Sequence, residues 1–280
     1  LKQKGELRFF STGHQKHRDT NVYEGVLVND LTYNSDQSFS KRGFASNYTL
    51  LLKNVNTNGI NSSSLKEDDS YSLLSQLLFE TKFPLRKEKG DNYSLLTPIL
   101  SARYSPNKSK NMKNLDKRIN YENIFSINRI SENDTIEEGQ SVTMGFEYEK
   151  YISNKKIIDF NLATNFSDQA KPDLPLKTSL NEKNSDIVGD LTISPSDYLK
   201  LGYEFSLDNN LGNSNFNLVK ADFDNNHFKT SFEYLEEDNH VGEKSYISNK
   251  TSLVINESKS ISLGTRKNLD KDITEYYNLI

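Results

Sequence analysis

Residues 141–150, SVTMGFEYEK, carry the feature that most limits what this chain can fold into. Apolar side chains fall on every second position, at Val142, Met144, Phe146 and Tyr148, with Thr, Gly and Glu between them. Successive side chains of a β-strand point to opposite faces, so this two-residue period predicts a strand with one apolar and one polar face. A chain built from many such strands has two different surfaces to cover or to solvate.

The same period recurs in segments of about ten residues. The clearest are IIDFNLATNF (157–166), YLKLGYEFSLD (198–208), HFKTSFEY (227–234) and ISLG (261–264). Segments before residue 141 carry longer apolar runs but keep strand-like lengths and turn residues at their ends. For residues 71–80 a helix remains an alternative to a strand, because Leu73, Leu74, Leu77 and Leu78 have helical spacing.

The connections between these segments are unequal in length. From residue 186 onward they are short and rich in Asn, Asp, Gly and Ser, the residues that hairpin turns use. Before residue 186 there are three long polar connections, near 57–69, 106–121 and 167–185. The sequence therefore predicts an antiparallel meander of about thirteen strands. No domain boundary is evident, so we expect residues 1–280 to form one domain.

Composition argues against several classes of protein. The net charge is −4, and the 35 Lys and Arg are mixed with the 39 Asp and Glu, which argues against nucleic-acid binding. No apolar run is long enough for a transmembrane helix, and zero cysteines exclude disulfides and thiolate metal sites. The opening LKQKGELRFF has no signal-peptide pattern, so we expect either a cytosolic chain or a segment cut from a longer precursor.

Only 34% of the residues are hydrophobic, and two β architectures accommodate this differently. A soluble sandwich hides one face of each strand between two sheets. A transmembrane barrel turns its apolar face to lipid and its polar face to a wet lumen, so it needs no packed interior. Polar mid-strand residues such as Asp159, Lys200 and Glu204 favour the barrel. In a barrel, the residues expected to face outward and be exposed are Val142, Met144, Phe146, Phe160, Leu162, Leu201, Phe205, Phe228 and Phe232.

Three stretches resemble a known family. LLTPILSARYSPN (95–107) contains a Thr-Pro strand that ends in RYSP, and NIFSINRISENDTIEEGQSVTMGFEY (123–148) carries an Asn-Arg, Asp and Gly block before an alternating strand. Together with DLTISPSDYLKLGYEFSLD (190–208), they are similar to the barrel region of the lipopolysaccharide-assembly family LptD. One departure is the tripeptide Ser-Glu-Asn at 131–133, where the family has a Gly between the Arg and the Asp.

The resemblance implies an all-β fold, an antiparallel meander forming part of a large transmembrane outer-membrane β-barrel that is open and incomplete in this segment. The family's periplasmic N-terminal domain, its cysteine motif and its closing strands have no counterpart in the 280 residues. The matching motif positions are candidates for the lumen or its loops: Pro98, Asn128, Arg129, Asp134 and Gly139. An Arg129–Asp134 pair would fix a loop or line the lumen. Pro98 lacks an N–H for the ladder and marks a local break or bulge.

The two ends of the chain carry a further expectation. The last strand, 273–280, is followed by no turn signal. We therefore expect an open sheet in which the first strand, near 5–11, does not pair with the last, because pairing would instead indicate a small closed barrel.

The resemblance implies transport and no enzyme activity. LptD-type barrels pass lipopolysaccharide into the outer leaflet of a Gram-negative outer membrane. The partners implied are lipopolysaccharide, a plug lipoprotein of the LptE type, periplasmic bridge proteins and outer-membrane lipid, with no nucleic acid and no cofactor. We expect no metal at His14 and His17, and solvated acids at 137–138 and 236–237. Another barrel such as a porin, or a soluble β-rich binding or adhesion module, remains an alternative.

Overall fold

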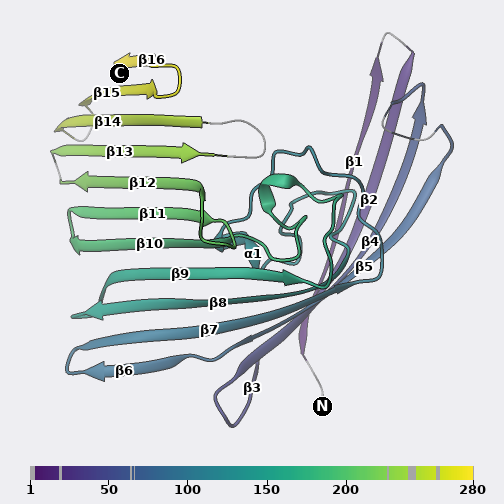
Figure 1. Ribbon diagram of the computed structural model, residues 1–280, viewed down its shortest axis with the longest axis horizontal. Helices are drawn as coiled ribbons and strands as arrows, with labels where there is room; N and C mark the ends of the chain where they lie inside the picture. Colours follow the sequence, from purple (N-terminus) through teal and green to yellow (C-terminus); the bar gives the residue numbers. More distant parts are fainter. Residues whose placement is uncertain are drawn as a thin grey trace.

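The computed structural model describes residues 4–18, 21–63, 65, 67–225, 227–238, 244–256 and 259–279, and most of them belong to one 16-stranded antiparallel sheet (Figure 1). The strands are β1 (Gly5–Arg18), β2 (Val22–Ser35), β3 (Ser38–Phe39), β4 (Ala45–Ile60), β5 (Ser70–Lys82), β6 (Leu85–Lys89), β7 (Asn92–Ser105), β8 (Gly139–Ile152), β9 (Lys155–Ser167), β10 (Ile187–Ser196), β11 (Leu199–Leu207), β12 (Ser214–Asp224), β13 (Phe228–Glu237), β14 (Lys244–Asn256), β15 (Lys259–Asn268) and β16 (Ile273–Leu279). Two single turns, α1 (Tyr121–Ile124) and the 3-10 turn η1 (Leu176–Thr178), lie in the connections.

The strands pair in chain order, so the predicted meander is confirmed. The main path has fourteen strands, close to the thirteen or so expected, and the short β3 and β6 lie off it, beside β4 and β7. Residues 71–80 form β5 and not a helix. Within the described residues β1 pairs only with β2 and β16 only with β15, which makes an open sheet of the kind that an incomplete barrel forms.

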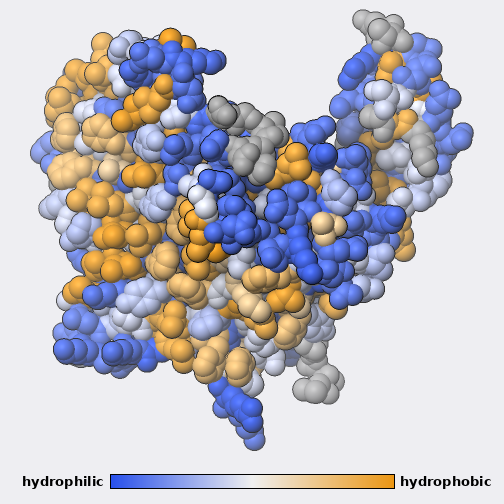
Figure 2. Space-filling view, viewed as in Figure 1, coloured by the Kyte–Doolittle hydropathy of each residue, from blue (hydrophilic) through white to orange (hydrophobic). Residues whose placement is uncertain are grey.

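Strand register places neighbouring side chains in common rows on each face. Thr143 of β8 lies opposite Ser101 of β7 and Asn165 of β9, and all three side chains are buried on the inner face. One residue further along, Met144 lies opposite Leu100 and is 50% exposed. Polar rows thus face inward and apolar rows face outward. Figure 2 shows hydrophobic residues gathered over the strands and hydrophilic residues over the central connections.

The outward apolar face is open to its surroundings over the described residues. Among the described residues no second sheet packs on it, so this sheet is not one layer of a sandwich. Of the nine side chains expected to be exposed there, four are exposed: Met144, Leu201, Phe228 and Phe232. Four more are half-buried: Val142, Phe146, Phe160 and Leu162.

Phe205 was expected to be exposed, and that expectation is wrong. Its ring lies over Gly189 of the neighbouring strand, where a Cβ would come within 2.6 Å of the ring. It also stacks on Tyr203 with ring centroids 5.3 Å apart. The missing side chain of Gly189 leaves room that the aromatic ring fills, so Phe205 is buried although it points outward.

The two ends of the strands differ. At the short-turn end, hairpins such as β8–β9 close with two residues, and Ser153 and Asn154 take left-handed φ values of 48° and 63°, as a type I′ turn requires. At the opposite, long-loop end lie the connections 61–69, 106–138 and 168–186.

The connections 106–138 and 168–186 form a structure that we call the inner bundle. In Figure 1 it lies in the angle between the β1–β5 strands and the β8–β13 strands. Its apolar side chains pack with two inward residues of the sheet into a small core: Met112, Ile119, Ile124, Ile130, Leu174 and Leu180, with Ala163 and Val188. At α1, the side chain of Asn120 accepts from the Asn123 N–H (3.1 Å) and the Asn123 side chain accepts from the Asn120 N–H (3.0 Å).

Candidate functional site: the inner bundle and the lumen beneath it

A buried ion pair holds the connection 106–138, the first connection of the inner bundle, against the sheet. The connection 168–186 is its second. The guanidinium of Arg129 binds the Glu137 carboxylate twice, Nη2 to Oε1 at 2.5 Å and Nε to Oε2 at 2.7 Å. Arg129 Nη1 also donates to Asn165 Oδ1 of β9 (2.9 Å) and Thr143 Oγ1 of β8 (3.3 Å). One side chain therefore joins the connection to two strands.

Two more cations surround the same carboxylate. Arg103 Nη1 lies 3.3 Å from Glu137 Oε2, and Lys171 Nζ lies 3.5 Å from Glu137 Oε1. Arg103 comes from β7, Lys171 comes from the second connection, and all of these side chains are almost completely buried. We call Arg103, Arg129, Glu137 and Lys171 the Glu137 cluster.

The charges of the Glu137 cluster determine the pKa values of its members. Burial alone would raise the pKa of Glu137, but the positive charges of Arg129 and Arg103 outweigh it and bring the pKa to about 2. Burial lowers the pKa of Lys171, and the Glu137 charge only partly offsets this. Glu137 is therefore ionised in the folded protein, as a carboxylate facing three buried cations must be.

The inner bundle should loosen in acid. The pKa of Glu137 falls from the ordinary 4.5 to about 2 on folding, so its stabilising contribution is complete above pH 4.5 and is lost as the pH falls from there through 2. We expect backbone hydrogen exchange in 106–138 and 168–186 to accelerate across this window. A Glu137→Gln variant should show little of this pH dependence, and an unchanged profile in that variant would contradict the assignment.

A second ionic anchor ties both connections to β13. The Glu237 carboxylate forms ion pairs with Arg118 of the connection 106–138 and with Lys177 of the connection 168–186. Lys177 Nζ lies 3.0 Å from Glu237 Oε1. Lys177 also lies 2.6 Å from Asp116. Burial alone would lower the pKa of Lys177, but hydrogen bonds to Asp116 and Glu237 together with their charges outweigh it and hold that pKa above its ordinary value. This anchor therefore keeps its charge at neutral pH.

A third anchor joins the inner bundle to β2 and β4, in the part of the sheet formed by β1 to β5. Lys53 of β4 is almost fully buried, and its Nζ lies 2.7 Å from Asp30 Oδ1 and 2.7 Å from the Asn133 carbonyl oxygen. The inner bundle is thus tied to β2 and β4 on one side, β7 to β9 in the middle and β13 on the other side. Its contacts bridge the curve of the open sheet.

The acids at 137–138 and 236–237 are not uniformly solvated, which corrects the sequence-based expectation. Glu137 and Glu237 are buried, because each faces inward toward cations supplied by distant segments. Their neighbours behave closer to expectation. Glu138 is half-buried and accepts from the Ser109 N–H (3.0 Å), while Glu236 is exposed.

Four of the five candidates from the sequence lie in or next to the inner bundle, but one expected pair does not form. The expected pair was Arg129 with Asp134. Asp134 instead pairs with Lys110 (2.7 Å), and Arg129 pairs with Glu137. Asn128 Nδ2 donates to the Glu132 carbonyl (3.1 Å) and so closes the turn that follows it. Gly139 has φ +76°, and a Cβ there would lie 3.2 Å from the Lys171 Cε.

Pro98 lies apart from the bundle, in the middle of β7. Its register with β8 is unbroken, and on the other side the strand pairing is interrupted between β5 and β6 at residues 83–84. The Pro98 carbonyl accepts from the Phe83 N–H (3.0 Å) across this interruption. The ladder therefore breaks beside a residue that has no N–H to give it.

Several residues of the site gave little signal in the sequence. Lys171, Arg118 and Lys177 appear as ordinary charged residues in a chain that is rich in them, and Arg103 stands in the RYSP element with no sign of its partner. The one usable signal is alternation, since Arg103 and Lys53 fall on inward positions of strands and a lone inward charge needs a partner.

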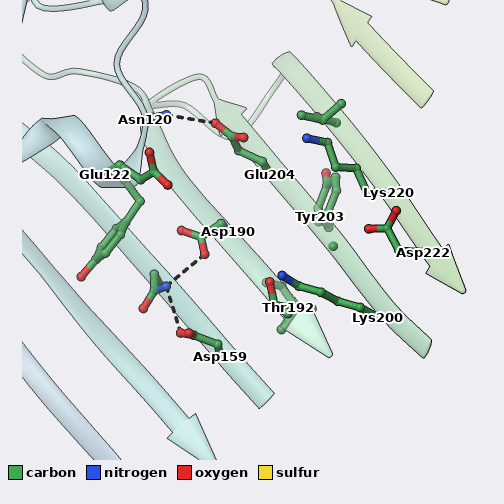
Figure 3. Close-up of a pocket in the computed structure, with 15 residues that line it drawn as sticks. Asn120, Glu122, Asp159, Asp190, Thr192, Lys200, Tyr203, Glu204, Lys220 and Asp222 are labelled. Carbon is green, nitrogen blue, oxygen red and sulfur yellow. Dashed lines mark hydrogen bonds between the residues drawn. The ribbon is translucent and has the colours of Figure 1, made fainter. Parts of the chain in front are cut away.

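Beneath the inner bundle the lumen holds a polar pocket of about 470 Å³. Figure 3 shows its walls, with Asn120 at the start of α1 and Glu122 within α1 on one side and the inner faces of β9 to β12 opposite. Asn161 donates to Asp159 (3.1 Å) and Asp190 (3.0 Å), and Asn120 donates to Glu204 (3.3 Å). Such a surface hydrates polar groups and repels acyl chains.

Two absences hold for the described residues. In that part of the chain no helix has the length and apolar character to cross a membrane. His, Asp and Glu side chains there form no group of three suited to a metal ion.

The family model for the lipopolysaccharide transport system protein LptD matches residues 28–261. The chain belongs to the LptD family. This family serves transport and assembly, and its cargo is lipopolysaccharide, so the role of the chain is in lipopolysaccharide transport to the outer membrane. The LptD match includes the inner bundle and all three of its anchors. No curated protein sequence matches the chain.

Proposed function

We propose that this LptD-family chain forms one barrel domain over residues 1–280, part of the wall of a translocon in a Gram-negative outer membrane that inserts lipopolysaccharide into the outer leaflet. The observation that carries the proposal is the two-faced sheet. Apolar rows face outward, as toward lipid, and polar rows face a lumen with a hydrated pocket. Lipopolysaccharide has the same division into acyl chains and sugars.

The geometry suits separate paths for the two parts of the cargo. Sugars and phosphates can stay hydrated along the inward polar rows, whereas acyl chains gain free energy by reaching lipid. Their exit needs a seam between strands, and opening a seam breaks a row of backbone hydrogen bonds that lipid cannot replace. Ladders as continuous as β7–β8, paired over 13 consecutive positions from Tyr93 to Ser105, are poor places for such an opening.

The lengths of the connections support an orientation. Outer-membrane barrels have short periplasmic turns and longer external loops. On this rule the short-turn end faces the periplasm and the inner bundle lies toward the cell exterior. Cargo entering from the periplasm would meet the polar pocket first and the inner bundle above it.

The partners follow from the same proposal. A plug lipoprotein of the LptE type would occupy the concave side of the sheet, and periplasmic bridge proteins would deliver cargo through a domain that precedes the barrel. Support for the plug is the polar surface of the pocket around Lys200, which is exposed, and Asp222, which is half-buried. The proposal involves no catalysis, no cofactor and no nucleic acid.

The test is site-specific photocrosslinking in cells from two positions at matched depth. Thr192 faces the lumen and lies opposite Gly202, while the neighbouring Leu201 faces outward near the short-turn end. With p-benzoylphenylalanine at Thr192 we expect adducts with lipopolysaccharide during active transport. At Leu201 we expect adducts with phospholipid of the inner leaflet.

Equal lipopolysaccharide yields at the two positions, or none at Thr192, would contradict passage through this lumen. The porin alternative predicts steady ion conductance in planar bilayers and no lipopolysaccharide adduct at Thr192. Measuring conductance on the same purified chain separates the two.

A further inference from the structure

Two glycines open a groove on the outer face of the β1–β5 arm. Gly13 and Gly25 both point outward, and the surface around them forms a depression of about 490 Å³. A Cβ on Gly13 would lie 2.7 Å from the Val26 carbonyl oxygen, and one on Gly25 would lie 3.0 Å from the Tyr23 hydroxyl. A side chain at either position would reduce the depression, so the glycines keep it open.

The groove lies at a defined height above the apolar rows. Strand register places Phe9, Leu31 and Leu52 in one outward row. The next row toward the long-loop end is polar on β1, β2 and β4, although β5 places Leu73 in it. Ser11 Oγ donates to Asn29 (2.7 Å), and Asn29 Nδ2 donates to Asn54 (3.2 Å). The rows beyond it line the groove, and they contain Gly13, Leu27, Asn56 and Tyr71, and then Gln15, Gly25 and Asn58.

This height corresponds to the headgroup region of one leaflet. Consecutive outward rows are about 6.6 Å apart, twice the rise per residue of a strand. The groove therefore begins within about two rows of the last continuous apolar row, where a bilayer gives way to its polar region. Because the groove is at the long-loop end, the proposed orientation makes this the outer leaflet, the leaflet that receives lipopolysaccharide.

The lining of the groove suits neutral sugars better than phosphate. Among the described residues that line it there is no Lys or Arg, and the side chain of His14 falls on the opposite face of β1. The one carboxylate, Asp69, is hydrogen-bonded to Asn58. Amides such as Asn56 and Gln15 can both donate to and accept from hydroxyl groups. Tyr71 is 73% exposed, so its ring can cover the C–H face of a sugar while its hydroxyl stays in water.

We propose that this groove binds the saccharide part of lipopolysaccharide in the outer leaflet, outside the barrel wall. The inference rests on the proposed function, which sets the orientation and the cargo. It adds a second contact to the lumen path, since the groove and the polar pocket lie on opposite faces and on different strands. The outer-face site would hold sugars beside the wall while the acyl chains pack against the apolar rows below.

The test places p-benzoylphenylalanine at Tyr71 in the full chain in cells. The matched control is Tyr198, which is also exposed but lies in the β10–β11 turn at the opposite, short-turn end. We expect lipopolysaccharide adducts at Tyr71 and none at Tyr198. Adding Asn56→Ala and Asn58→Ala should reduce the Tyr71 adduct roughly ten-fold, because two amide contacts to hydroxyls are lost. Core oligosaccharide freed of acyl chains should compete with it in detergent-solubilised protein.

The Thr192 crosslink separates the failure of this inference from failure of the proposed function. Adducts at Thr192 without any at Tyr71 would overturn the groove and leave the transport path intact. A Tyr71 adduct that resists both the Asn variants and the free oligosaccharide would show lipid contact alone and would also overturn it. Loss at both positions would overturn the groove together with the proposed function. An unchanged Thr192 yield in the Asn variants would show that the barrel still assembles.

Discussion

Replacing Glu137 by Gln should release the first connection from the sheet. Among the described residues Glu137 is the only carboxylate that forms ion pairs with Arg103, Arg129 and Lys171, and all four side chains are buried. Removing one partner of a buried ionic group leaves uncompensated charge and typically costs about 3–5 kcal/mol. We expect a Lys/Arg-specific protease to cut the 106–138 connection, for example at Lys117, roughly 100-fold faster or more, since cleavage follows the population of the open form.

The matched control is Asp134→Asn in the same connection. Asp134 also pairs with a cation, Lys110, but both side chains are partly exposed, and such pairs contribute about 0–1 kcal/mol. The control should therefore leave the cleavage rate nearly unchanged. Equal acceleration by Glu137→Gln and Asp134→Asn would mean that the connection is held by its surface charges, and the buried cluster would lose its assigned role.

The sheet could be predicted because its signal is local. The two-residue period of a strand comes from that strand's own residues. The alternation in 141–150 therefore predicted β8 without knowledge of the strands that pair with it. Residues 71–80 were ambiguous because Leu occupies both faces of β5. Leu73 and Leu77 point outward, while Leu74 and Leu78 point inward beside the bundle, and the resulting run imitates helical spacing.

The site could be predicted only in part because its partners are distant in sequence. The motif indicated Arg129, and the structure does bury that side chain. The acid expected to pair with it was Asp134, but the acid that does so is Glu137. Asp134 and Glu137 both follow Arg129 within ten residues, Asp134 being the nearer in sequence, and only the fold decides which one faces inward. Lys177 and Glu237 are separated by a whole meander of strands, so no local pattern links them.

In the inner bundle, the segment 171–174 contributes both to the buried ionic cluster and to the apolar core. The Leu174 N–H donates to the carbonyl of Lys171 (3.0 Å), so a residue of the small core and a cation of the Glu137 cluster share one turn. Loosening the core should therefore also displace the Lys171 ammonium. This coupling makes the apolar core testable by a reporter that lies in the ionic cluster.

Replacing Leu174 by Ala should open the second connection without changing any charge. Leu174 is completely buried, and truncating such a side chain costs about 2–5 kcal/mol because a cavity remains. The reporter is the Lys171 amide, which donates to the Asn181 carbonyl (2.8 Å), and its hydrogen-exchange protection should fall roughly 30-fold or more. Leu211→Ala in the exposed β11–β12 connection is the control and should change that protection little. Full protection in Leu174→Ala would mean that the ionic anchors hold the bundle without its core.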